Sequence, residues 1–83
     1  MSQNYPDPFD PSTTIKYLVL RQSNVTLKVF DVLGNEVSTI VNKLQSPENY
    51  EVEFDGNILT SGIYFYRLKA GDFIETMKML LLE

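Results

Sequence analysis

The 83-residue chain contains no cysteine, no histidine and no tryptophan. Without cysteine it forms no disulfide, carries no nucleophilic thiol and offers no thiolate to a zinc ion. Without histidine it also lacks the side chain that most often transfers protons in catalysis. These absences remove most of the common catalytic and metal centres, and we expect a non-catalytic domain that needs no cofactor and no metal.

Long apolar runs and clusters of basic residues are missing as well. No apolar stretch reaches the roughly 18–20 residues that a transmembrane helix needs, so we expect no membrane insertion. Eleven acidic residues against seven basic ones give a net charge of −4. The basic residues are scattered along the sequence, which argues against nucleic acid or an anionic membrane as a partner. They are Lys16, Arg21, Lys28, Lys43, Arg67, Lys69 and Lys78.

The chain does contain a series of short segments in which apolar and polar residues alternate, separated by turn-forming residues. This period of two indicates strands with one buried and one exposed face. The alternation slips at 30–32, which predicts a bulge or a bend, and the polar residues 42–49 are expected to form a loop. Six or seven short antiparallel strands and no helix are typical of a β-sandwich or a small barrel. The expected strands cover 15–19, 25–29, 37–41, 50–54, 63–69 and 73–82.

The clearest alternations also predict the core, because every second residue of a strand faces the same side. Residues 79–82 differ in being apolar at every position, so one apolar face of the C-terminal strand would remain open. Such a strand at a sheet edge can pair with another chain, and we expect a weak homodimer through it at high concentration. The predicted core consists of Val25, Leu27, Val29, Tyr50, Val52, Phe54, Tyr64, Tyr66 and Leu68.

Three prolines stiffen the N-terminal segment. Proline fixes φ and pushes the preceding residue to extended geometry, which excludes a helix. We expect Tyr5 and Phe9 to anchor this segment on the sandwich. The spacing of Pro6, Pro8 and Pro11 is also that of a polyproline II ligand, but the two aromatic side chains favour burial and a structural role.

Two groups of carboxylates are candidate sites, and each has a simpler interpretation. Glu51 and Glu53 share one strand face, where a solvated surface is a simpler interpretation than a glycosidase pair. Four aspartates supply the oxygen ligands that Ca²⁺ binds, yet each also suits a turn or a strand end. Such a site would consist of Asp7 and Asp10 together with either Asp31 or Asp55.

Four segments together resemble the C-terminal sorting domains of type IX secretion cargo. The segments are 3–15 (QNYPDPFDPSTTI), 29–37 (VFDVLGNEV), 59–68 (LTSGIYFYRL) and 78–82 (KMLLL). They occur in the family's order and span nearly the whole chain. The family usually has asparagine where this chain has Asp7 and Asp10. Met77 stands where the family often has a base, and Glu83 stands where it often ends in Lys or Arg.

The resemblance implies an immunoglobulin-like sandwich, over residues 5–83, at the C-terminus of a secreted or cell-surface protein that passes through the periplasm. Residues 1–4 would then be a non-native start and the remnant of a linker to the parent cargo domain. The implied role is an export signal that the outer-membrane translocon and its processing machinery recognise. The implied recognition residues are Lys78, Met79, Leu80, Leu81, Leu82 and Glu83. The implied structural motif consists of Tyr5, Pro6, Pro8, Phe9, Pro11, Gly34 and Gly62.

A second interpretation is open at this point. Flagellar hook-capping proteins contain immunoglobulin-like domains with related sequence patterns, so the chain could instead be a structural spacer or an interaction domain of a surface protein. The two interpretations share the fold and differ in whether the C-terminal strand is recognised by an export apparatus.

Overall fold

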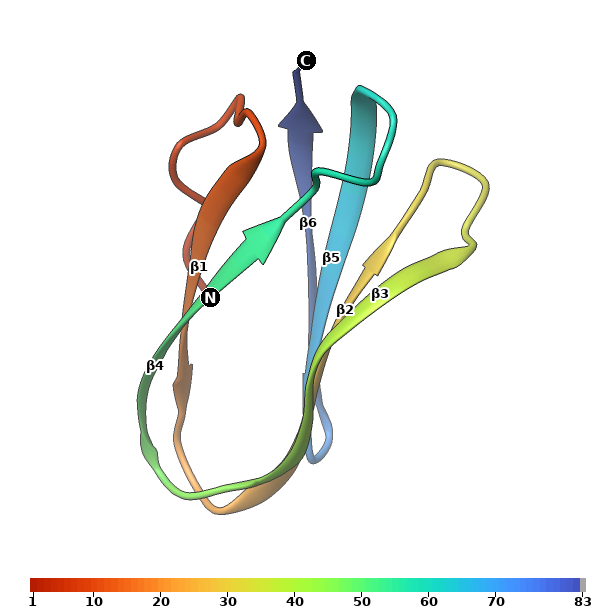
Figure 1. Cartoon of the computed structure of the whole chain (residues 1–83). Coiled ribbons are helices and arrows are strands. Elements are labelled where there is room, and N and C mark those ends of the chain that lie inside the picture. The colour runs from red at the N-terminus through yellow and green to blue at the C-terminus, as the bar shows by residue number, and fades with distance from the viewer. Residues whose placement is uncertain (83) are drawn as a thin grey trace.

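The computed structural model describes residues 1–82 as a β-sandwich (Figure 1). All paired strands are antiparallel, and the described part of the chain contains no helix, hence none that is long and apolar enough to cross a membrane. The all-β antiparallel sandwich is therefore confirmed, and its form is compatible with an immunoglobulin-like fold. The strands are β1 (Ser12–Val19), β2 (Ser23–Phe30), β3 (Glu36–Gln45), β4 (Glu48–Asp55), β5 (Gly62–Ala70) and β6 (Phe73–Leu81).

Two sheets of unequal size face each other. β1 pairs with β4 in the smaller sheet, and the larger sheet has the order β3-β2-β5-β6. The β2–β3 and β5–β6 connections stay within the larger sheet, whereas the other three cross from one sheet to the other. A tight hairpin joins β5 to β6, with Gly71 at φ 61°. β6 consequently forms one edge of the larger sheet.

The predicted loop over 42–49 is wrong. β3 continues to Gln45 and β4 begins at Glu48, which leaves Ser46 and Pro47 as the connection. The polar composition misled the prediction because β3 is an edge strand. Its backbone pairs with β2 while several of its polar side chains face solvent. In Figure 1 the two strands follow one another in a continuous curve from one sheet to the other.

The bulge or bend predicted at 30–32 is a turn, because β2 ends at Phe30 and Val32 and Leu33 lie in a turn, whereas the bulges of this region lie on β3. β2 pairs with β5 in unbroken register as far as Phe30. The β2–β3 register shifts twice instead, where β3 contributes the extra residues Ile40 and Val37. A bulge adds a residue to one strand of a pair. The edge strand therefore takes up the irregularity, and the central strand β2 keeps its alternation.

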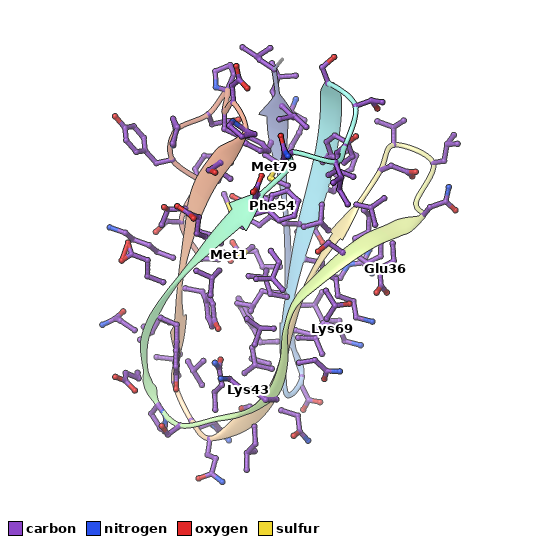
Figure 2. All side chains as sticks on the ribbon, in the orientation of Figure 1. Met1, Glu36, Lys43, Phe54, Lys69 and Met79 are labelled. Atoms are coloured by element: carbon purple, nitrogen blue, oxygen red, sulfur yellow. The ribbon has the colours of Figure 1, made fainter. Side chains whose placement is uncertain are left out.

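The core lies between the two sheets and contains seven of the nine predicted residues. Tyr50 and Val52 are half-buried and pack against it instead. Phe9 and Phe54 meet edge to face with their ring centroids 6.2 Å apart. Figure 2 shows Phe54 and Met79 in the space between the sheets. The buried apolar residues are Phe9, Ile15, Tyr17, Val19, Val25, Leu27, Val29, Val41, Phe54, Tyr64, Tyr66, Leu68, Met79 and Leu81.

Candidate functional site

The predicted recognition residues lie at the end of β6, on the edge of the larger sheet. The strand's alternation divides them between two faces. Met79 and Leu81 enter the core, whereas Lys78, Leu80 and Leu82 turn outward. Leu81 is 2% exposed and Leu82 is 46% exposed. The apolar run therefore serves the core with one face and leaves the other available at the surface.

An N-terminal strap, residues 2–9, lies between β1 and β6 and contacts the edges of both. On one side, the backbones of Tyr5 and Thr14 exchange two hydrogen bonds of 3.0 and 2.9 Å. On the other side, Phe9 forms a parallel bridge with Leu81. The strap thus joins the two sheets along one side of the sandwich.

Four hydrogen bonds from the strap cover the outer edge of β6 at the predicted recognition residues. Two use the strap's backbone and two use its side chains, which take the place of the backbone groups of a further strand. This part of the edge is therefore occupied within the molecule and is not open for strand pairing. The bonds, from donor to acceptor, are Gln3 Nε2 to Lys78 O (2.8 Å), Leu80 N to Asp7 Oδ1 (2.9 Å), Phe9 N to Leu80 O (2.9 Å) and Leu82 N to Phe9 O (2.9 Å).

Asn4 fixes the strap from the inside and is only 2% exposed. Its backbone N–H donates to the Tyr66 hydroxyl at 2.8 Å, and its Nδ2 donates to Thr13 Oγ1 at 3.0 Å and to Pro6 O at 3.2 Å. Burial raises the pKa of Tyr66, so this hydroxyl keeps its proton at neutral pH. Sequence reasoning missed Asn4, because its partners come from three different places in the chain.

Phe9 is the buried anchor that the sequence predicted, but Tyr5 is not. Phe9 is 1% exposed and Tyr5 is 80% exposed. The strap alternates like a strand where it pairs with β1. Since Asn4 faces inward, the ring of Tyr5 faces solvent. The other motif residues of this segment, all exposed, are Pro6, Pro8 and Pro11.

Both glycines of the predicted motif lie at or next to turns with positive φ, Gly34 at 86° and Gly62 at 146°. Asp31 organises the first of these turns. Its Oδ1 accepts hydrogen bonds from Leu33 N and Asn35 N, both at 2.9 Å. These bonds, the one from Asn35 foremost, lower the pKa of Asp31. The side chain is thus used by the turn.

Three further carboxylates of the candidate groups, those of Asp55, Glu51 and Glu53, also serve the backbone or face solvent. Asp55 Oδ1 accepts a hydrogen bond from Asn57 N at 2.8 Å. Glu51 and Glu53 are exposed on β4, as expected for a solvated strand face. Residues 1–82 contain no group of three carboxylates, histidines or cysteines that could hold a metal ion. Glu83, the last predicted recognition residue, lies outside the described residues.

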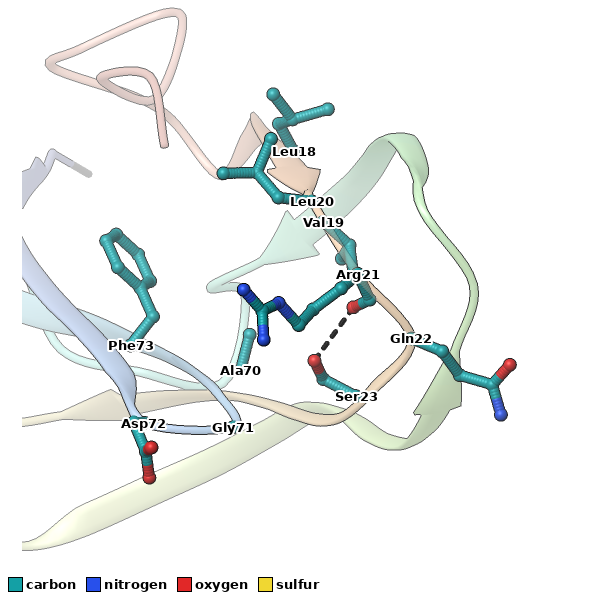
Figure 3. Close-up of a pocket in the computed structure, with 10 residues that line it drawn as sticks. All are labelled: Leu18, Val19, Leu20, Arg21, Gln22, Ser23, Ala70, Gly71, Asp72 and Phe73. Atoms are coloured by element: carbon teal, nitrogen blue, oxygen red, sulfur yellow. Dashed lines mark hydrogen bonds between the residues drawn. The ribbon is translucent and has the colours of Figure 1, made fainter.

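A shallow hollow lies at the end of the molecule away from the strap, between the β1–β2 turn and the β5–β6 hairpin (Figure 3). Leu20 and Phe73 contribute exposed apolar side chains to it. Figure 3 shows Asp72 directed away from Arg21, so these two charged groups do not converge. Because a small-molecule site needs a few convergent polar groups, this hollow is better suited to an apolar contact.

The fold and the strap define a class: a small all-β domain whose terminal strand lies at a sheet edge and is held there by the domain's own N-terminal segment. Residues 3–83 match the family model described as a secretion system C-terminal sorting domain. The chain therefore belongs to this family of type IX secretion sorting domains. No curated protein and no solved structure matches it. The family carries the C-terminal sorting signal of type IX secretion, a non-catalytic module that implies a cargo protein, the type IX machinery and an extracellular destination.

Proposed function

We propose that this chain is the sorting domain of a larger cargo protein that the type IX system moves through the periplasm and the outer membrane to the cell surface or the exterior. The family match over residues 3–83 is the observation that supports this most directly. The outward side chains of Lys78, Leu80 and Leu82 supply a surface that an export apparatus can contact without unfolding the domain. Its partners are then the outer-membrane translocon, the processing machinery and the cargo domain that precedes it.

A reporter fusion tests this role. Residues 3–83 are fused to a periplasm-directed fluorescent reporter in a host with a type IX apparatus, and surface display is measured by protease accessibility and flow cytometry. The native fusion should reach the surface, and deletion of residues 78–83 should leave it in the periplasm.

The deletion also removes Leu81 from the core, so a second variant is needed. Lys78→Ala, Leu80→Ser and Leu82→Ser together change only outward side chains of the segment. This triple variant should lose display while it keeps the fold, as judged by its circular dichroism spectrum. If the native fusion stays in the periplasm, the sorting role is wrong and a spacer role is favoured. If both variants are displayed as well as the native fusion, the C-terminal strand does not carry the signal.

We also propose a weak homodimer through β6, in a narrower form than the sequence suggested. The strap covers the edge of the strand at 78–82 but not at its beginning. Ile74 is 58% exposed there, and Phe73 beside it is 52% exposed. An apolar and uncovered length of edge strand supports pairing between copies.

A further inference from the structure

The outer face of the larger sheet carries side chains that neither the core nor the strap uses. The β5–β6 register places Phe65 opposite Lys78 and Ile63 opposite Leu80. On the other side of β5, Phe30 of β2 lies opposite Phe65. Directly opposed side chains of paired strands lie about 5 Å apart. The outward residues of these three strands therefore form one continuous surface, here called the outer face.

The centre of the outer face is apolar and partly exposed. Ile63 is 42% exposed, and Phe30, Phe65 and Leu80 are half-buried. The exposed Leu82 extends this area beyond the end of β6. The recognition segment is thus continuous with apolar residues that precede it by more than ten positions in the sequence.

The rim of the outer face is positively charged. Lys28 and Arg67 are opposed in the β2–β5 register, and Lys69 and Lys78 continue the rim on β5 and β6. Four of the seven basic residues of the chain thus lie on this face, three of them on the side of the apolar area toward the β5–β6 hairpin and Lys78 beside Phe65. They are scattered in the sequence and come together only through strand pairing. Two carboxylates border this face: that of Glu36 on β3 lies 3.1 Å from Lys28 Nζ, and that of Asp7 in the strap accepts a hydrogen bond from Leu80 N.

The rest of the molecule has the opposite charge. The outer face of the smaller sheet carries Glu51, Glu53 and Asp55 against Lys16 as its single base. In Figure 2, Glu36 and Lys69 lie on the side of the larger sheet that faces away from the core. A chain with a net charge of −4 therefore presents one positive face, and that face contains the outward recognition residues.

This arrangement fits a protein surface better than a polyanion. Lys28 is paired with Glu36, and the Arg67 guanidinium lies 4.7 Å from the centre of the Phe30 ring. Within the described residues, this leaves Lys69 and Lys78 as the two basic side chains of the rim without such a contact. Tight binding to nucleic acid or an anionic membrane uses more cations than this. An apolar area bordered by charged side chains is instead typical of a protein–protein interface. Opposite potentials on the two partners would speed their encounter.

We propose that the outer face of β5 and β6, and not the C-terminal segment alone, is the surface that the type IX machinery recognises. Its partner is a protein of that machinery with an apolar area bordered by carboxylates. This inference rests on the proposed sorting function and adds Ile63, Phe65, Arg67 and Lys69 of β5 to the recognition residues.

Charge reversal on β5 tests the outer face separately from the C-terminal segment. Arg67→Glu with Lys69→Glu should lower surface display of the reporter fusion about tenfold, since like charges at an interface are strongly unfavourable. The matched control, Glu51→Lys with Glu53→Lys on the smaller sheet, should change display less than about twofold, because exposed substitutions away from an interface have small effects. Arg67→Lys, which keeps the charge, should be displayed like the native fusion.

The outcomes separate the two proposals. Suppose that the native fusion is displayed, that the 78–83 deletion variant is not, and that the β5 charge-reversal variant is displayed normally. The outer-face proposal is then wrong, and the sorting function stands. If the native fusion is not displayed, the sorting function itself fails.

A photo-crosslinking amino acid gives a second measurement that does not depend on display. Placed at Phe65 or Lys69, it should give adducts with a type IX component at an acidic peptide, whereas the same group at Glu53 should not. Equal adducts from Glu53, or adducts only with lipid or with a second copy of the chain, would overturn the proposal.

Discussion

Asp7 shows at the scale of a single residue how a side chain can complete a sheet edge. Its Oδ1 accepts a hydrogen bond from Leu80 N, 73 positions later in the chain. A backbone N–H that finds no partner costs free energy when it is withdrawn from water, so an acceptor at this place has a structural purpose. An asparagine side chain has the same Oδ1 acceptor.

Replacing Asp7 tests this account. Asp7→Ala should lower the free energy of unfolding by about 1–3 kcal/mol, because Leu80 N loses its acceptor. Asp7→Asn should change it by less than about 0.5 kcal/mol. Urea unfolding measures both, and amide exchange at Leu80 should be at least about tenfold faster in the alanine variant only. Equal effects of alanine and asparagine would show that the acceptor at Asp7 is unimportant.

Asp31 predicts a dependence of stability on pH. Hydrogen bonds from the turn hold its folded pKa below its ordinary value of 3.8. Between the two pKa values the unfolded chain binds more protons, so the contribution of Asp31 to stability is present above about pH 4 and is lost as the pH falls further. The melting temperature of Asp31→Asn should therefore lie below that of the native chain near pH 6, and the difference should shrink near pH 2.

A neutral control isolates the carboxylate. Val32→Ala lies in the same turn at an exposed position and has no titrating group. The difference in melting temperature between Val32→Ala and the native chain should be the same near pH 6 and near pH 2. A difference for Asp31→Asn that is equally independent of pH would contradict the assignment.

At the scale of the element, β6 divides its alternate residues between the core and the surface. Leu81 faces the core beside the ring of Phe9, and a Cβ at position 56 would lie 3.1 Å from Leu81 Cδ2. Leu82 belongs to the outward series with Lys78 and Leu80. A substitution at an inward position of this strand should therefore act on stability, whereas one at an outward position should act on the proposed recognition.

Two neighbouring alanine substitutions separate these effects. Leu81→Ala should lower the free energy of unfolding by about 2–5 kcal/mol, since it removes buried methyl groups and leaves a cavity. Leu82→Ala should cost less than about 1 kcal/mol, as expected for a partly exposed side chain. Chemical denaturation of the two variants measures the difference. Comparable losses would show that the described alternation does not govern the end of the strand.

The strands with clear alternation could be predicted from the sequence because their pattern is local. Val25, Leu27 and Val29 repeat every second residue, and the backbone period alone places them on one face. The strap contacts could not be predicted, because Asn4 and Asp7 bind groups that only the folded chain brings near. The C-terminal end of β3 could not be predicted either, because the polar residues of an edge strand have the same composition as a loop.

The outward recognition residues were predicted only as a continuous segment. A family resemblance identifies a stretch of sequence, while strand alternation divides that stretch between the core and the surface. The positive rim was hidden for a related reason. Lys28 and Arg67 are 39 positions apart and become neighbours only through the β2–β5 register.

At the scale of the whole molecule, charge and edges are both distributed unevenly. The larger sheet has a positive outer face and the smaller sheet a negative one. The strap covers one part of the β6 edge and leaves another part open. Copies of the domain can therefore meet at the open edge even though each carries a net charge of −4, because salt screens repulsion beyond about 8 Å.

The beginning of β6 is the place where two copies should associate. In an antiparallel ladder, alternate residues direct their N–H and C=O groups to the same neighbour. The strap bonds to Lys78, Leu80 and Leu82, so Ile74 and Thr76 direct their backbone groups to the same outer side, beyond the strap's reach. Two such edges can pair around a twofold axis, with Ile74 of each copy near the contact.

Sedimentation across a concentration series should therefore show dimers of the native chain at millimolar concentration. Ile74→Lys should keep the chain monomeric, because a charge on an edge strand blocks pairing with another edge. Leu82→Lys is the matched control and should associate like the native chain, since the strap already occupies the edge at that residue. A native chain that stays monomeric at this concentration would mean that the short open edge is too small to hold two copies together. Loss of association in Leu82→Lys but not in Ile74→Lys would place the contact at the C-terminal end of the strand, and the strap would then have to leave that edge when the dimer forms.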